Sequence, residues 1–206
     1  RLAFRIIGNA KRYGPDTVIE LVNGVPEDAP NDFKRAVFFH AGGVLARLDP
    51  ERAASWYERH MMHSYSLGSL GNIATKWAVE HDAAAAIAWI EGLDLDASHK
   101  KERGEAIGNA FASWQAKAPG DARTWLTSIA PGPIRDRSIK QMAKAITHDS
   151  PAEAMYWVQQ IDDDELRRRQ MFRYTRRWFL QDPDGVKDWL AADRKSTRLN
   201  SSHTSI

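Results

Sequence analysis

Apolar residues recur along the chain at a helical spacing around a series of tryptophans. Relative to each tryptophan, apolar side chains stand three residues before it, one after it and four after it, as in Ala122, Trp125, Leu126 and Ile129. The spacing i, i+3, i+4, i+7 places one apolar stripe on an α-helix. The pattern therefore predicts a short amphipathic helix at each tryptophan, which we call helix A.

Each helix A carries one short motif, Pro-x-x-Ala-x-x-Trp, which returns every 32 to 36 residues with some copies degenerate. Its tryptophan position is held, in chain order, by Leu21, Trp56, Trp89, Trp125, Trp157 and Trp189. Proline suits the first turn, where its missing N–H has no helical partner. Asp49, Asp149 and Asp182 stand just ahead of three prolines and are expected to cap the helix or favour its positive end. A fixed period of this length is typical of stacked units that cannot bury their apolar face alone.

A second helix, helix B, is expected after a short polar or glycine-containing loop in each repeat. We expect these helices near 30–47, 66–80, 98–117, 133–147 and 163–180. Trp77, Trp114 and Trp178 lie near the ends of three of them, eleven or twelve residues before the next helix-A tryptophan. Sustained strand alternation is missing from the sequence. The predicted fold class is all-α: a right-handed α-solenoid of about five antiparallel helix hairpins with this period of 32 to 36 residues.

The repeat resembles two known patterns. Proline six residues before tryptophan, with Phe111 eight before Pro119, is similar to the tetratricopeptide repeat, although the leucine-glycine pair of that family is missing. The segment 129–136 and the run from Trp178 to Trp189 look like Trp-rich DPxxAxxW helical repeats of uncharacterised bacterial proteins. The resemblance covers nearly all of residues 1–192. It implies a TPR-like architecture and carries no defined activity.

The ends of the sequence are expected to be unusual. Residues 193–203 resemble the translation of a sequencing adapter, so residues 193–206 are predicted to be a non-native, disordered tail. Residues 1–13 have the pattern of the middle of a helix, which predicts that 1–192 is an internal fragment of a longer protein. Without the tail the chain has 26 basic and 26 acidic residues. This balance argues against nucleic acid as a partner, because phosphate binding needs uncompensated Lys and Arg.

Composition excludes some classes of protein. The chain has no cysteine, which excludes disulfides and thiolate zinc sites. Its apolar stretches are shorter than the roughly 18 residues of a membrane span. With 43% apolar residues it can bury a sizeable core. The sequence leaves the compartment open between cytoplasm and periplasm, and no cofactor is expected.

Three clusters could carry chemistry. His60 and His63 have a metal-compatible spacing, but His60 falls on the apolar stripe and is expected to be a packing histidine. The acidic run 162–165 precedes a helix B, where capping is the favoured role. The basic cluster between Arg167 and Arg177 could bind phosphate or RNA, but pairing with the acidic run or solvation is favoured.

A polar ladder on helix A is the predicted binding surface. It lies one residue before and two after the tryptophan positions and consists of Ser55, Glu58, Glu91, Thr124, Thr127, Tyr156 and Gln159. If helix A lines a concave side, these residues would contact a peptide; plain solvent exposure is the alternative. The sequence favours a non-catalytic scaffold that binds a protein or peptide. Alternatives are a structural or regulatory arm of a larger protein, an enzyme built on a closed helical toroid, and a nucleic-acid binder.

Overall fold

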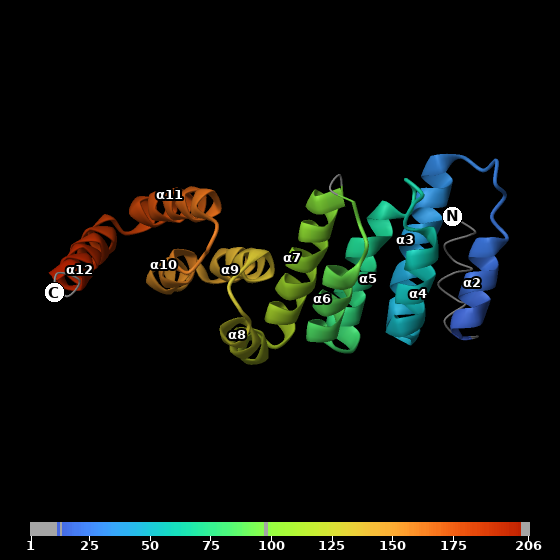
Figure 1. Ribbon diagram of the computed structural model, residues 1–206, viewed down its shortest axis with the longest axis horizontal. Coiled ribbons are helices and arrows are strands. Elements are labelled where there is room, and N and C mark those ends of the chain that lie inside the picture. Colours follow the sequence, from blue (N-terminus) through green and yellow to red (C-terminus); the bar gives the residue numbers. More distant parts are fainter. Residues whose placement is uncertain (1–11, 13, 97–98, 203–206) are drawn as a thin grey trace. The chain divides into compact units, whose positions relative to one another are not determined.

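A computed structural model describes residue 12, residues 14–96 and residues 99–202, with side chains as far as residue 192. Every regular element in this described part is a helix (Figure 1). In chain order they are α2 (Pro15–Asn23), α3 (Asn31–Leu48), α4 (Pro50–His60), α5 (Leu67–Glu80), α6 (Ala83–Gly92), α7 (Lys100–Lys117), α8 (Pro119–Ser128), α9 (Pro133–Ile146), α10 (Pro151–Gln159), α11 (Asp164–Gln181) and α12 (Pro183–Ser202). The predicted all-α helical-repeat fold is confirmed.

The two helix types alternate as the sequence predicts. The even-numbered helices from α2 to α12 are the six copies of helix A, and the odd-numbered helices from α3 to α11 are the five copies of helix B. The helix-B bounds agree with the predicted ranges to within two residues. The expected helix over residues 1–13 lies outside the described residues, apart from residue 12. The side chains of residues 193–206 are also outside the description, so the non-native origin and disorder of that tail stay predictions.

Helix A begins with a proline or an aspartate cap. Asp49 accepts a hydrogen bond from the Arg52 amide at 3.0 Å, and Asp182 accepts one from the Gly185 amide at 2.9 Å, which confirms both as caps. Asp149 is not the cap of α10, because Ser150 stands between it and the helix and occupies the N-cap position; that its charge favours the positive helix end stays a prediction. In α6, which lacks the proline, Asp82 supplies the cap to the Ala85 amide at 2.9 Å.

The small residue of the motif is the most consistent core position. Three residues before the tryptophan position, every copy from Val18 to Val186 is buried, and four of these residues are alanines with no exposed surface: Ala53, Ala86, Ala122 and Ala154. Trp56 and Trp157 are also buried, whereas Trp89, Trp125 and Trp189 are half-buried. A small side chain allows a neighbouring helix to approach, and the indole covers the hairpin next to it.

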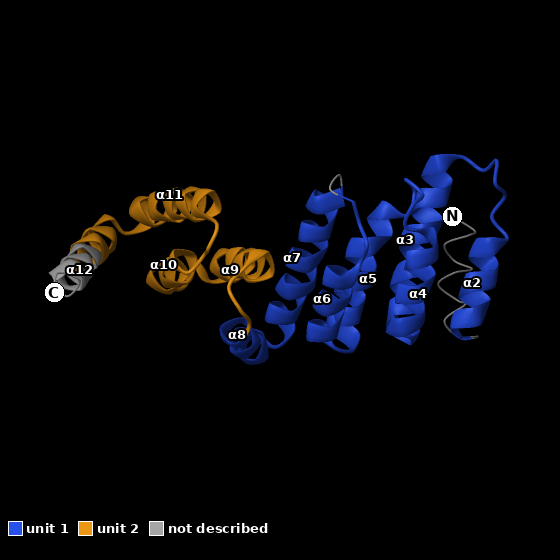
Figure 2. Cartoon of the chain, viewed as in Figure 1, with its two compact units in different colours: residues 1–128 blue, residues 129–206 orange. Residues whose placement is uncertain are grey.

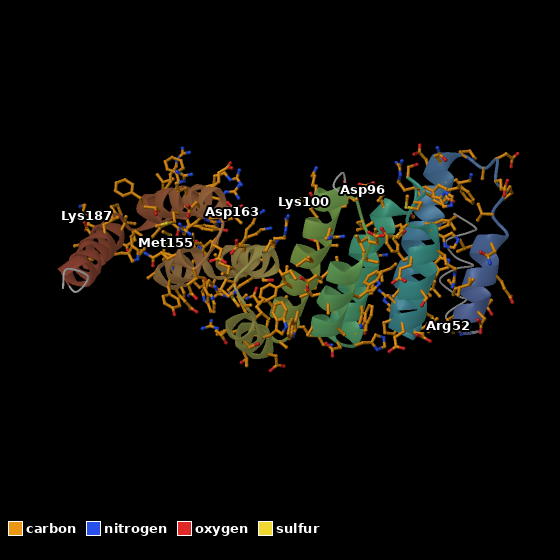
Figure 3. The ribbon with its side chains drawn as sticks, viewed as in Figure 1. Arg52, Asp96, Lys100, Met155, Asp163 and Lys187 are labelled. Atoms are coloured by element: carbon orange, nitrogen blue, oxygen red, sulfur yellow. The ribbon has the colours of Figure 1, made fainter. Side chains whose placement is uncertain are left out.

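The chain divides into two compact units (Figure 2). Unit 1 comprises residues 1–128 and unit 2 comprises residues 129–206. In unit 1 the most extensive packing joins helices B to one another, α3 to α5 and α5 to α7, while each helix A packs on its neighbouring helices B. The helix-A row is linked mainly by long side chains. Arg52 of α4, labelled in Figure 3, pairs with Asp16 of α2.

Glycines allow the helix-B row of unit 1 to pack closely. A Cβ on Gly43 of α3 would lie 2.4 Å from Asn72 Nδ2 of α5, and one on Gly42 would lie 3.0 Å from Ile73. Asn72 uses this proximity, since its Nδ2 donates to the Phe39 carbonyl of α3 at 2.7 Å. Asn109 of α7 lies near Gly71 of α5, where an added Cβ would be 3.7 Å from its Nδ2. The seam therefore depends on two glycine contacts and an asparagine that crosses between helices.

Unit 2 is held by loop contacts rather than by a comparable helix-B seam. α9 packs on α10, α10 on α11 and α11 on α12. Asp136 of α9, which is buried, accepts the amides of Asp162 and Asp163 with its two carboxylate oxygens, at 2.8 and 2.9 Å. Arg135 donates to the Gln160 side-chain oxygen at 2.8 Å. Arg135 and Asp136 thus fix the loop between α10 and α11.

Candidate binding surfaces

All seven residues of the predicted helix-A ladder are exposed. They are Ser55, Glu58, Glu91, Thr124, Thr127, Tyr156 and Gln159. The structure distributes them over both compact units, with the first five in unit 1 and the last two in unit 2. Exposure agrees with a binding role and equally with the plain solvation that the sequence left open. That a peptide runs along these residues stays a prediction.

Three ladder residues have local structural partners. Glu58 of α4 accepts a hydrogen bond from Trp89 Nε1 of α6 at 3.0 Å, so it links two copies of helix A. The Thr124 hydroxyl donates to the Gly120 carbonyl at 3.0 Å, and the Thr127 hydroxyl donates to the Thr124 carbonyl at 2.7 Å. These hydroxyls are turned to their own helix backbone. Tyr156, at 60% exposure, presents the largest free apolar area of the ladder.

The histidine pair belongs to an aromatic cluster. The His60 Nδ1 lies 2.7 Å from the Trp56 carbonyl oxygen, which makes this nitrogen the donor. The His60 ring packs against Phe38, and the His63 ring stacks on Tyr65 at a centroid distance of 4.9 Å. Among the described residues no group of three or more His, Asp or Glu could hold a metal ion. The structure thus gives His60 the packing role favoured by its sequence position.

A pocket of about 240 Å³ adjoins this cluster in unit 1. It is lined by Val22, Asn23, Val25, Glu27, Lys34, Phe38, His60, His63 and Tyr65. The Lys34 ammonium lies 5.6 Å from the centroid of the Tyr65 ring and donates to the Glu27 carbonyl. The lysine therefore already has an aromatic partner and a carbonyl partner.

The acidic run 162–165 is a helix start, as predicted. Asp163, labelled in Figure 3, accepts the Leu166 amide at 2.8 Å and is the N-cap of α11. The hydrogen bond from the Leu166 amide lowers the pKa of the Asp163 carboxyl; burial opposes it, and the Glu165 amide, Arg169 and Arg167 add to the lowering. Asp164 and Glu165 lie in the first turn, where carboxylates offset the helix dipole.

The basic cluster of α11 divides into two sets. The first set is paired: Arg167 binds Asp164 and the Ile161 carbonyl, and Arg169 binds Glu165 at 2.7 Å. Arg103 of α7 holds the Leu93 carbonyl in the same way, and both arginines stand eleven residues before a helix-B tryptophan. Arg167 is therefore a repeated loop contact, and the expected pairing with the acidic run is confirmed for this first set.

The second set of arginines faces outward with apolar neighbours. Within the described residues, Arg173, Arg176 and Arg177 form no ion pair with an acidic side chain, and they are exposed. Phe172, Phe179 and Leu180 on the same helix are 72%, 50% and 77% exposed. We call these six residues the α11 face. On a helical wheel five of them lie on the side opposite the buried Tyr174 and Trp178, and Arg177 lies at the edge of this side.

The α11 face was only partly visible in the sequence. The arginines form a basic cluster in the sequence, whereas Phe179 and Leu180 do not stand out, because three apolar or aromatic residues follow one another from Trp178 and obscure the periodicity. The available signal is the repeat register: Phe172 stands six residues before Trp178, and the corresponding position before Trp77 is Gly71.

Burial raises the pKa of Tyr174, and the nearby charges of Arg173 and Arg177 oppose this effect.

Comparisons of the chain with protein-family models, with curated proteins and with solved structures return no match. No helix in the described part of the chain is long and apolar enough to cross a membrane.

Proposed function

We propose that this protein is a non-catalytic helical-repeat scaffold that binds another protein or a peptide. The observation that supports the proposal best is the α11 face, where three large apolar side chains lie exposed on one helix among three arginines that form no ion pair with the described residues. Clustered exposed apolar side chains are typical of interaction sites, whereas single ones are common on any surface. Arginine and aromatic residues are also the types enriched where interfaces concentrate their binding energy.

The ladder on helix A is the second surface through which the scaffold would bind. Tyr156 is its strongest candidate anchor, because an exposed phenol ring offers a large contact area and few rotatable bonds. Glu91 is a candidate polar contact. Glu58 is a less informative residue to substitute, since its loss would also remove the hydrogen bond to Trp89.

Affinity capture from an extract of the source cells tests the proposal. The full chain is immobilised and compared with two variants, Glu91→Ala/Tyr156→Ala and Phe172→Ala/Phe179→Ala, and captured proteins are crosslinked and mapped to their contact residues. We expect one or a few proteins that are retained by the unmodified chain, crosslink to the ladder or to the α11 face, and are lost in the matching variant. A chain that retains nothing above the bare matrix, or retains proteins equally in all variants, contradicts the proposal.

A further inference from the structure

The repeat register shows what the α11 face replaces. In α5 and α7, the position six residues before the helix-B tryptophan is a glycine: Gly71 before Trp77 and Gly108 before Trp114. At Gly71 the next helix B comes close enough for Asn109 to lie 3.7 Å from an added Cβ. In α11 the same position is Phe172, which is exposed. The position at which α5 receives α7 thus carries an exposed aromatic side chain in α11.

The spacing of the apolar residues also fits a helical partner. Phe172 and Phe179 are seven residues apart, so they lie on one side of α11 and roughly 10 Å apart along its axis. Residues at i and i+7 are the anchors by which one helix contacts another lengthwise. Because the glycine is replaced by phenylalanine, the partner helix would be held by protruding rings rather than by close backbone approach.

The positive charge of the α11 face indicates that its partner carries acidic side chains. Arg176 is three or four residues from Phe172, Phe179 and Leu180, and Arg173 and Arg177 lie on the same side as Leu180. No acidic side chain of the described residues pairs with these arginines. A partner that covers the rings would desolvate these guanidinium groups, which is costly unless carboxylates meet them. Glutamate or aspartate beside an apolar stripe would satisfy them, with bidentate geometry available to each arginine.

The acidic groups around the face argue against a nucleic-acid strand. The basic segment from Arg168 to Arg177 spans roughly 14 Å of helix. Before it stands the run 162–165, and after it stand Asp182 and Asp184. A phosphate backbone that extended beyond the arginines would meet these carboxylates. A short acidic helix fits between them.

We propose that the α11 face binds an acidic amphipathic helix of another protein, an inference that rests on the proposed scaffold function and specifies its partner. The partner helix carries apolar residues at i, i+3 or i+4 and i+7, flanked by Asp or Glu. The apolar stripe covers Phe172, Phe179 and Leu180, and the carboxylates pair with Arg173, Arg176 and Arg177.

A displayed library of single helices tests this with the full chain. One face of each peptide is limited to Leu, Ile, Phe and Ala, and the flanking positions vary among Asp, Glu, Ser, Lys and Arg. We expect selection to enrich Asp and Glu at the flanks. A selected peptide should bind Phe172→Ala/Phe179→Ala and Arg173→Glu/Arg176→Glu at least about tenfold more weakly. Phe39→Ala/Arg59→Glu, which alters an exposed Phe and Arg in unit 1, is the matched control and should bind normally.

Charge reversal separates recognition from damage to the fold. A version of the selected peptide with Lys in place of its acidic residues should regain binding to Arg173→Glu/Arg176→Glu and not to the unmodified chain. All substituted side chains are exposed, so helix content measured by circular dichroism should be unchanged. The proposal is overturned if selected flanks show no acidic preference, if the α11 variants bind as well as the control, or if the Lys version regains nothing.

Other occupants of the face give different results. Binding of fluorescein-labelled oligothymidylate that is lost in the arginine variant, without selection of acidic helices, would assign the face to nucleic acid and overturn the proposal. Self-association that disappears in Phe172→Ala/Phe179→Ala would assign it to a second copy and also overturn it. Selected peptides that depend on Glu91 and Tyr156 instead would refute the α11 proposal while supporting the scaffold function. That function fails only with the capture experiment.

Discussion

The indole rings of Trp114 in α7 and Trp125 in α8 lie with their centroids 5.4 Å apart and their planes inclined by 56°. Trp77 with Trp89 and Trp178 with Trp189 form the same pair, at 5.6 and 6.2 Å. In each pair the first tryptophan lies near the C-terminal end of a helix B and the second lies on the following helix A. Since aromatic rings prefer such inclined contacts, the pairs close the junction between successive repeats.

The Trp114–Trp125 pair should contribute coupling energy of its own. We expect a double-mutant cycle with Trp114→Leu and Trp125→Leu to show about 1 kcal/mol of interaction in the free energy of urea unfolding. The matched control is Trp77→Leu with Trp125→Leu, two residues that belong to different pairs, and its effects should add to within about 0.5 kcal/mol. Additive effects in the Trp114–Trp125 cycle would show that the rings merely fill space.

The helical fold was predictable because its signals are local and repeated. The apolar spacing around Trp125 defines a helix by itself, and the recurrence of prolines and tryptophans fixes the period. Asp49 and Asp182 were predictable as caps from their place before a proline. Asp149 shows the limit of this reasoning, because a shift of one residue gave the N-cap position to Ser150.

The contacts between repeats were not predictable in the same way. In the sequence, Gly42 and Gly43 are equally compatible with a flexible segment, a turn or the close approach of another helix. Only the position of α5 shows that they allow α3 and α5 to pack closely. Asp136 is similar, because its two amide partners lie 26 and 27 residues further along the chain. The α11 face exists because Phe172 and Phe179 are left uncovered. Whether a side chain is covered is decided by packing and cannot be read from the sequence pattern.

The buried carboxylate of Asp136 should be important for unit 2. Replacing it with alanine removes both acceptors from the Asp162 and Asp163 amides, and we expect a loss of about 3 kcal/mol, with a smaller loss for Asp136→Asn, which keeps one acceptor. Asp162→Asn, at an exposed side chain, is the control and should change stability by less than about 0.5 kcal/mol. Hydrogen exchange at the amides of residues 162 and 163 should accelerate in the Asp136 variants. Unchanged exchange there would contradict the role assigned to this carboxylate.

Two glycine substitutions should have opposite effects. In Gly43→Ala the new methyl group would lie 2.4 Å from Asn72 Nδ2, so the asparagine must move and lose its bond to Phe39. We expect a loss of about 2 kcal/mol. Gly68→Ala places its methyl group in open space on α5 and should stabilise the chain by about 0.5 to 1 kcal/mol. Thermal unfolding of both variants measures this, and a neutral or stabilising Gly43→Ala would refute the close seam between α3 and α5.

Tyr57 gives the fold a dependence on alkaline pH. Its side chain is fully buried, its hydroxyl has no hydrogen-bond partner among the described residues, and burial with the nearby Glu102 charge raises its pKa to about 12. The folded state therefore holds the Tyr57 proton more tightly than the unfolded state, whose pKa is near 10. The stability that depends on this proton is complete below pH 10 and is lost as the pH rises toward 12. The full effect is about 2 to 3 kcal/mol.

Tyr57→Phe tests this directly. At neutral pH the variant should be as stable as the unmodified chain or more stable by about 1 kcal/mol, since it removes a buried hydroxyl that makes no hydrogen bond. Its advantage in urea unfolding should grow between pH 10 and 12. In that range the Tyr57 phenol of the unmodified chain ionises when the chain unfolds, which favours the unfolded state, and the variant has no such group. Tyr156→Phe, at an exposed ring, is the control and should follow the unmodified chain at every pH. Parallel pH profiles for Tyr57→Phe and the unmodified chain would show that the Tyr57 hydroxyl is solvated in the folded protein, and a large loss at neutral pH would show that it has a hydrogen-bond partner.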